Sequence, residues 1–222
     1  MNEHAFTCQD EDLVLLAEKA LWWKCQSCVF VADVHLGKAS SFRASGVPVP
    51  EGSDATDLER LSAIIDHTKA KEICILGDLI HNLDSLTKPV IEAFGQWRRQ
   101  HPKIRLGLTL GNHDRYVPKL METLQIDVCE DRVLRGPFVF QHEPELSPDG
   151  YVIAGHVHPG VRVSEKRTRS LNLACCLIGE RVMTLPAFGT FTGTQRVRAA
   201  EGDRVVAFAE GGLIEVPWKL CS

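Results

Sequence analysis

Apolar runs alternate with stretches of helical periodicity through the first two thirds of the chain. Short runs rich in β-branched residues lie at 29–34 (VFVADV), 72–79 (EICILGDL) and 104–114 (IRLGLTLGNHD), which is typical of strands. Residues 54–70 and 88–100, between these runs, carry apolar side chains at helical spacing. This order of strands and helices predicts a parallel or mixed sheet with helices packed against it.

Beyond residue 127 the pattern changes to short strands separated by turns, with hairpin turns at GER and EGG. The strands are expected within residues 132–144, 151–160, 169–186 and 203–217. A second, β-rich half that packs its sheet on the first sheet gives a layered α/β sandwich. No long linker, repeat or low-complexity segment interrupts the chain, so a single domain over residues 1–222 is expected.

The composition is that of a soluble protein, with 222 residues of which 44% are apolar. No apolar run is long enough to span a bilayer, and the first residues lack the pattern of a signal peptide. We therefore expect a cytoplasmic protein that does not associate with membranes. Its eight cysteines are expected to be reduced, and packing is the favoured interpretation of the Cys25–Cys28 pair because a structural zinc site needs a second spaced pair.

The net charge of −4 argues against a uniformly basic surface for nucleic acid. Basic residues nevertheless outnumber acidic ones between residues 160 and 205, which is compatible either with a solvated face or with a patch that faces phosphate. The basic residues of this segment are Arg162, Lys166, Arg167, Arg169, Arg181, Arg196, Arg198 and Arg204.

Polar side chains follow five apolar runs at the point where each run ends. Ligands of open α/β sheets bind in the crevice outside the carboxyl ends of the strands, so five segments direct polar side chains at one edge. These side chains are Asp33 and His35 after VFVA, Asp78 and His81 after EICIL, Asn112, His113 and Asp114 after LGLTL, His142 after FVFQ, and His156 and His158 after YVIA.

Carboxylates, imidazoles and an amide oxygen, without thiolates, are ligands that suit manganese, iron or zinc at a catalytic centre. Two neighbouring metals need a shared carboxylate, and Asp78 is the natural bridge. Two divalent ions with only two carboxylates leave a net positive site that attracts phosphate. We expect one metal on Asp33, His35, Asp78 and His158, and the other on Asp78, Asn112, His142 and His156.

The motifs D-x-H, GD, GNHD, a lone His and GHxH, in this order, resemble those of the calcineurin-like metallophosphoesterase superfamily. ALWWK, HLGKASSFRASGVPVP, GDLIH and LPAFGTFTG are similar to segments of its bacterial ligase-associated DNA damage response endonuclease family, and this resemblance covers nearly the whole chain. It implies a four-layer αββα sandwich of mixed sheets flanked by helices. It further implies two divalent metals, manganese before iron or zinc, a phosphodiester substrate such as DNA, and association with DNA ligase or helicase repair proteins.

One motif departs from the superfamily pattern. Phosphatases of the superfamily commonly carry GDxxDR, whose second Asp orients the His of GNH and whose Arg holds a terminal phosphate. His81 and Asn82 occupy these two positions. The resemblance therefore favours phosphodiesters over phosphomonoesters, since a dianionic phosphate lacks its cationic clamp.

The remaining expectations concern roles near the metals. A water of lowered pKa would attack phosphorus, and His113 would protonate the leaving alkoxide. Asp114 would orient His113 or cap the following helix, and His81 would bond a substrate phosphate or a metal ligand. Lys38 and Arg43, expected in a loop, would hold substrate phosphate or remain solvated.

Aromatic residues leave two interpretations open. Trp22 and Trp23 favour packing over stacking on bases, and Phe188 and Phe191 would either pack in the core or line the mouth of the site. The motifs are compatible with three functions. A phosphodiesterase or nuclease is favoured, a phosphatase or hydrolase of a small nucleotide or other phosphorylated metabolite is the alternative, and a non-catalytic scaffold is disfavoured by the complete ligand set.

Overall fold

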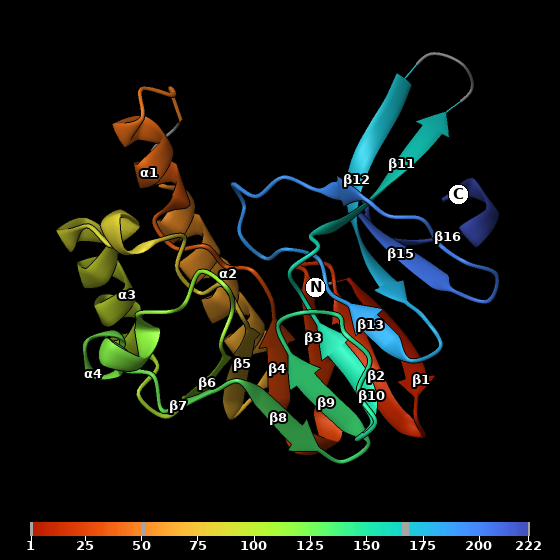
Figure 1. Cartoon of the computed structure of the whole chain (residues 1–222), viewed down its shortest axis with the longest axis horizontal. Helices are drawn as coiled ribbons and strands as arrows, with labels where there is room; N and C mark the ends of the chain where they lie inside the picture. The colour runs from red at the N-terminus through yellow and green to blue at the C-terminus, as the bar shows by residue number, and fades with distance from the viewer. Residues whose placement is uncertain (1, 50–51, 166–168, 222) are drawn as a thin grey trace.

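The computed structural model describes residues 2–49, 52–165 and 169–221. Two β-sheets pack face to face, and helices cover the outer face of the first sheet (Figure 1). The first sheet has the strand order β1-β2-β3-β4-β5-β6-β7, antiparallel from β1 to β4 and parallel from β4 to β7. Its strands are β1 (Glu3–Cys8), β2 (Glu11–Leu16), β3 (Ala20–Trp23), β4 (Cys28–Val31), β5 (Glu72–Leu76), β6 (Arg105–Thr109) and β7 (Val128–Glu130).

The α-helices of the described residues all lie before Gln125. They are α1 (Lys38–Ala44), α2 (Ser53–Thr68), α3 (Lys88–Gln100) and α4 (Met121–Leu124), with the 3₁₀ turns η1 (Lys24–Gln26), η2 (Leu83–Ser85), η3 (Val117–Lys119) and η4 (Trp218–Leu220). Alternation along β4 explains the layers. Val29 and Val31 pack with Leu61 of α2 and Phe94 of α3, whereas Phe30 faces the second sheet. The helices predicted over 54–70 and 88–100 are confirmed.

Two elements near the N-terminus were not expected from the sequence. The hairpin β1–β2 turns on Gln9 and Asp10, whose φ angles are 51° and 62°. Two central residues with positive φ make a type I′ turn, which Asn-Gly or Asp-Gly usually signals. The segment with Lys38 and Arg43, expected as a loop, is the short helix α1.

The second sheet has the order β14-β11-β12-β13-β10-β9-β8, and β15 joins it beside β12 and carries β16. The hairpin turns predicted at GER and EGG are confirmed by the antiparallel pairs β12–β13 and β15–β16. Its strands are β8 (Arg132–Arg135), β9 (Phe138–Gln141), β10 (Tyr151–Ala154), β11 (Pro159–Glu165), β12 (Arg169–Ile178), β13 (Val182–Thr184), β14 (Gln195–Arg196), β15 (Arg204–Ala209) and β16 (Gly212–Val216).

Aromatic side chains join the two sheets. Phe30 and Phe140 stack with ring centroids 4.0 Å apart, and Trp23, which is fully buried, meets Phe138 edge-on at 5.0 Å. The predicted packing role of Trp23 is confirmed. The α/β class with two mixed sheets is also confirmed, while the outer face of β12 and β15 is packed, within the described residues, by Val197, Ala199 and Cys221 rather than by an α-helix.

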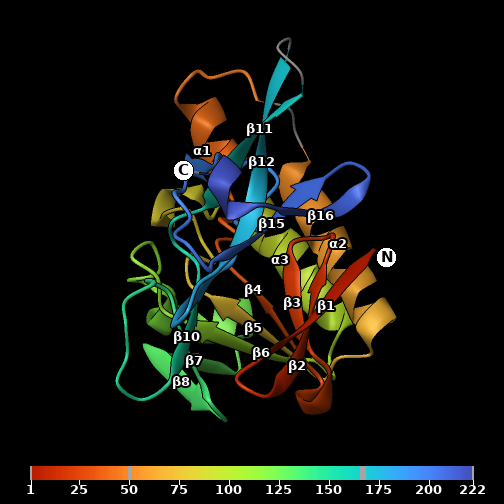
Figure 2. The ribbon, with the colours of Figure 1, turned by 90° about the vertical axis from the view of Figure 1, so that its right-hand side faces the viewer.

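The topology brings the carboxyl ends of strands from both sheets to one edge. β4, β5 and β6 are parallel, and so are β9 and β10. Helix α1 and the β11–β12 hairpin rise from the same end of the molecule in both views (Figures 1 and 2). None of the described helices is both long enough and apolar enough to cross a membrane.

Candidate metal centre and active site

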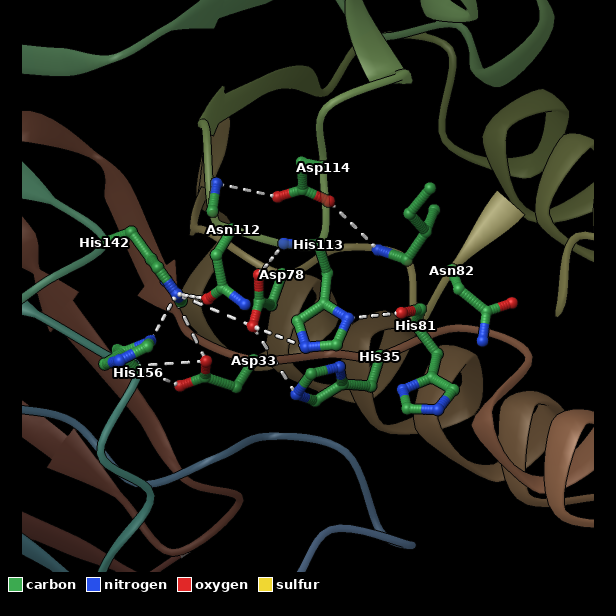
Figure 3. A network of polar contacts seen from close by, with 12 residues as sticks. Asp33, His35, Asp78, His81, Asn82, Asn112, His113, Asp114, His142 and His156 are labelled. Atoms are coloured by element: carbon green, nitrogen blue, oxygen red, sulfur yellow. Dashed lines mark hydrogen bonds and ion pairs between the residues drawn. The ribbon is translucent and has the colours of Figure 1, made fainter. Parts of the chain in front are cut away.

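All seven predicted metal ligands gather where five strands end, and Figure 3 labels each of them except His158. Those from the first sheet follow β4, β5 and β6, and those from the second sheet follow β9 and β10. Together they are Asp33, His35, Asp78, Asn112, His142, His156 and His158. The structure thus brings together side chains that are up to 125 residues apart in the sequence (His158 minus Asp33).

Left-handed backbone conformations direct most of these side chains. The φ angles are 54° at Asp33, 51° at His35, 51° at Asp78, 68° at His156 and 50° at His158. Non-glycine residues pay about 1–3 kcal/mol for such conformations, which persist where the surrounding structure holds them and cluster at functional sites. Five strained positions among the predicted ligands indicate that the loops are shaped for this site.

The glycines before the ligands admit the side chains of neighbouring loops. A Cβ atom at Gly77 would overlap the ring of His142, and one at Gly111 would overlap the carboxylate of Asp78. Only glycine allows such close approach of a backbone. The GD and GN motifs are therefore explained by packing between adjacent ligand loops.

One group of donors surrounds the carboxylate of Asp33. Nε2 of His158 lies 3.3 Å from Oδ1 of Asp33 and 3.4 Å from Nε2 of His35. Nε2 of His35 is 3.8 Å from Oδ2 of Asp78. Burial lowers the pKa of His35 to about 2, so the imidazole is neutral and one ring nitrogen carries a lone pair.

A second group surrounds His142, which is buried. Its Nε2 lies 3.0 Å from Oδ1 of Asn112, 2.9 Å from Nδ1 of His156 and 3.5 Å from Oδ2 of Asp78. Oδ2 of Asp78 therefore faces both groups, as expected of a bridging ligand. In Figure 3, Asp78 lies between His142 and His156 on one side and His35 and His113 on the other.

The chemistry of the donors fits divalent metal ions. Nδ1 of His142 lies 3.1 Å from the carbonyl oxygen of Leu76, which can only accept, so the ring hydrogen is on Nδ1. Nε2 then presents a lone pair to the oxygens of Asn112 and Asp78. Hydrogen-bond acceptors that face one another repel unless a cation lies among them. A hydrogen bond to a backbone carbonyl, such as that of Leu76, commonly fixes the tautomer of a metal-bound histidine.

His113 lies beside this centre without belonging to either group of expected ligands. Its backbone N–H donates to Oδ1 of Asp78 over 3.0 Å, and its Nε2 lies 4.0 Å from Oδ2 of the same residue. Nδ1 donates to the backbone carbonyl of His81. This contact engages Nδ1, so Nε2 is the ring nitrogen that faces the carboxylate of Asp78.

His81 contacts His113 through its ring as well as through its backbone carbonyl. The ring lies nearly parallel to that of His113, with a 20° interplanar angle and 5.4 Å between centroids. Its Nδ1 is a buried atom without a hydrogen-bond partner among the described residues. Burial, followed by the charges of Lys38 and His113, lowers the pKa of His81. The expected contact with a substrate phosphate stays a prediction.

Asp114 takes neither of the two roles expected for it. Its buried carboxylate accepts from the backbone N–H groups of Gly111 (3.0 Å), Leu79 (3.3 Å) and Ile80 (3.2 Å). The next helical turn, η3, has Tyr116 as its N-cap, and the ring of His113 is held by His81. Asp114 therefore ties the GNHD loop to the GDLIH loop, a role that depends on the fold and not on neighbours in sequence.

Lys38, Arg43 and Asn82 follow the first two ligand motifs along the chain. Burial lowers the pKa of Lys38 and the carboxylates of Asp33 and Asp78 oppose this shift, so the amine belongs to the electrostatic environment of the ligands. Arg43, in the last turn of α1, donates from Nη2 to Ser40. Asn82 caps η2 by accepting from the N–H of Ser85 at 2.7 Å, so its side chain has a structural role.

Sequence reasoning missed the residues that hold the LPAFGTFTG segment. The carboxylate of Asp57, in α2, accepts from Thr190, and Arg60 donates to the carbonyl of Phe188 at 3.0 Å. Phe188 is buried, whereas Phe191 is 39% exposed. The sequence carries only a weak signal for this role of Asp57 and Arg60, because acidic and basic residues on the polar positions of a helix usually face solvent.

Two further expectations concern residues away from the metals. Of the basic residues in segment 160–205, Arg204 pairs with Glu215 at 2.8 Å and Arg162 donates to Ser170, while Lys166 and Arg167 lie outside the described residues. All eight cysteines are free and six are buried. Cys28 is buried, which fits the packing interpretation, whereas Cys25 is exposed; for Cys25 that interpretation stays a prediction.

The two facing sheets and the histidine–aspartate clusters at their carboxyl edge define a metallophosphoesterase, a metal-dependent phosphoester hydrolase. The chain is similar to a solved structure, the Pseudomonas putida nuclease MPE, with 33% identity and a TM-score of 0.82 over 93% of this chain and 97% of that one. The protein belongs to the metallophosphoesterase family of this nuclease. The resemblance found in the sequence motifs is thus confirmed.

Two other solved structures are more distant. A phosphoesterase from E. coli shares 14% identity with a TM-score of 0.43, over 84% of this chain and 90% of that one. A protein of unknown function from Aquifex aeolicus shares 17% identity with a TM-score of 0.43, over 59% and 78%. No protein-family model and no curated protein matches the chain.

Proposed function

We propose that this protein is a dinuclear metal-dependent phosphodiesterase that cleaves DNA. The position of Asp78 between two groups of possible metal ligands, with His113 beside it, is the observation that carries the proposal. The similar Pseudomonas putida protein is described as a nuclease, which supports a nucleic acid as the substrate. Oxygen and imidazole donors without thiolates favour manganese, with iron or zinc as alternatives.

In this proposal, Asp33, His35 and His158 hold one metal, Asn112, His142 and His156 hold the other, and Asp78 contacts both. When bound, two such ions supply a water of lowered pKa and positive charge that stabilises the phosphoryl oxygens. The ligands come from both halves of the chain, which supports the proposal that residues 1–222 act as one catalytic domain.

His113 is proposed to donate a proton to the leaving alkoxide. Its Nδ1 is engaged with the carbonyl of His81, so Nε2 is the nitrogen that exchanges the proton. The amine of Lys38, near Asp33 and Asp78, is proposed to bind a non-bridging oxygen of the substrate. Arg43 and His81 complete the proposed phosphate contacts.

A diester fits this edge better than a monoester. The position at which phosphatases of the superfamily carry the phosphate-holding Arg is occupied by Asn82, whose side chain caps η2. A dianionic phosphate would therefore lack a cation at this point, whereas a diester carries one charge less. Small nucleotides remain the alternative substrates, because they share the phosphodiester chemistry.

The cellular setting is part of the proposal. Reduced and largely buried cysteines favour a reducing compartment, so we place the protein in the cytoplasm. A DNA-repair role beside DNA ligase or helicase proteins follows from the family resemblance of the motifs and is testable by co-purification with such proteins.

The deciding experiment compares hydrolysis of bis(p-nitrophenyl) phosphate and p-nitrophenyl phosphate by the manganese-loaded protein. The shared leaving group isolates the charge of the phosphate, and the Asp78→Ala variant, prepared identically, measures contaminating activity. Faster cleavage of the diester is expected. Faster cleavage of the monoester would overturn the diesterase proposal and turn the search to phosphorylated metabolites, and equal activity of Asp78→Ala would refute the site.

A further inference from the structure

Two aromatic side chains, Phe42 and Phe191, lie at the rim of the active site and belong to none of the hydrophobic core clusters of the described residues. Phe191 is 39% exposed, and Phe42 of α1 is half-buried. Their rings meet edge to face, with centroids 5.6 Å apart and an interplanar angle of 74°. Leaving two large rings partly in water forgoes the free energy of burial, so this pair is explained better by a ligand than by folding.

The pair is connected to the catalytic histidines through a row of rings. Phe42 lies nearly parallel to His81, at 16° and 6.3 Å between centroids, and His81 lies nearly parallel to His113. The row leads from the proposed proton donor outward to Phe42. The aromatic pair therefore lies on the side of the site where the leaving group departs.

The loop that carries Phe191 is fixed to the segment directly after β4, which contains the proposed metal ligand Asp33. Its backbone N–H groups at Phe188 and Gly189 donate to the carbonyls of Ala32 and Asp33, over 2.7 and 3.1 Å. A rigid loop offers its ring to a ligand at little entropic cost.

A pair of charged side chains on α2 fixes the same loop from the other side. Asp57, which is 4% exposed, accepts from the N–H of Thr190 at 3.0 Å, next to Phe191. Arg60 donates to the carbonyl of Phe188, and its guanidinium lies over the Phe188 ring at 4.1 Å. Burial raises the pKa of Asp57, while bonds from Thr190 and Arg60 oppose this shift. The side chain of Arg60, which is 23% exposed, also pairs with the buried carboxylate of Asp57 at 2.7 Å, so both side chains are fixed against the loop, as expected of a positioning role.

We propose that Phe42 and Phe191 form a base-stacking subsite for the nucleobase on the leaving-group side of the scissile phosphodiester, and that Asp57 and Arg60 position it. This inference rests on the proposed action on nucleic acid. Every base has an apolar π-face, so the subsite tolerates any base and recognises a nucleotide by its ring and not by its sequence. The phosphate is held at the metal centre, and the base adds affinity at a distance from the chemistry.

The test uses two substrates of equal charge, a short oligodeoxythymidylate and an oligomer of the same length with base-free sugars throughout. Stacking contributes about 5- to 150-fold in affinity, so wild type is expected to show a lower KM for the first substrate by a factor in this range. Phe42→Leu and Phe191→Leu are expected to erase this difference by raising KM for the thymidylate alone, with kcat little changed. Leu134→Ala, which removes a 54% exposed side chain from β8, is the matched control.

Asp57→Asn and Arg60→Lys separate positioning from folding. Both are expected to raise KM for the thymidylate and to leave cleavage of the base-free oligomer unchanged. Equal KM values for the two substrates in wild type, or Phe variants with wild-type preference, would overturn the subsite while leaving the phosphodiesterase proposal intact. A wild-type protein that cleaves neither oligomer would refute the proposed function itself, and the subsite with it.

Discussion

Replacing Asp114 by alanine tests whether this carboxylate ties two catalytic loops together. Of the three backbone N–H groups that it accepts from, those of Leu79 and Ile80 belong to residues with 0% exposure. A buried donor left without its partner costs about 1–3 kcal/mol, so two donors give a loss of about 2–6 kcal/mol. This loss is a large part of the 5–15 kcal/mol by which a typical domain is stable.

Urea denaturation followed by tryptophan fluorescence measures the loss, and an unchanged slope confirms that the native and unfolded states keep their compactness. Asp127→Ala is a matched control, because Asp127 also accepts a backbone N–H, that of Leu106 at 2.7 Å, but contacts Arg98 instead of the metal loops. Both variants are expected to lose stability, and only Asp114→Ala to lose manganese affinity. Wild-type stability in Asp114→Ala would refute the bracing role.

Three more outcomes are expected. Gly111→Ala loses manganese binding by calorimetry, because the added Cβ overlaps the Asp78 carboxylate; binding of wild-type strength would show that the loop can yield. Chelation of metal is expected to abolish diester hydrolysis and to lower the melting temperature, and added manganese is expected to restore both. The melting temperature responds because a ligand that binds only the folded state stabilises it. Full activity in the presence of chelator would contradict a metal-dependent enzyme. His113→Ala slows cleavage of an oligonucleotide by about 10²–10⁴-fold and of bis(p-nitrophenyl) phosphate much less, because p-nitrophenolate leaves without a proton; equal losses would argue against proton donation.

The sequence predicted the parts of the fold that follow from local pattern. The strands that end at Val31, Leu76 and Thr109 are buried on both faces, and their apolar runs are visible without a structure. Each polar ligand interrupts such a run at the point where it ends. The collection of the ligands at one edge followed from the general rule for strand ends, and the structure places them together.

Features that depend on distant partners were out of reach of the sequence. Asp114 follows GNH directly, so a local role was the natural expectation, but two of its three donors lie 35 and 34 residues earlier in the chain. Asp57 and Thr190 are 133 residues apart. The β1–β2 turn uses Gln9 and Asp10, residues that seldom signal a two-residue hairpin, and α1 is too short for helical periodicity to show.

The number of metals per chain tests the central claim most directly. Purified protein is saturated with manganese, dialysed, and its metal content is measured by elemental analysis beside that of Asp78→Ala. We predict two ions per wild-type chain and weaker binding of both ions in Asp78→Ala, because the Asp78 carboxylate faces both groups of donors. One ion or none in wild type, or two firmly held ions in Asp78→Ala, would contradict the dinuclear site.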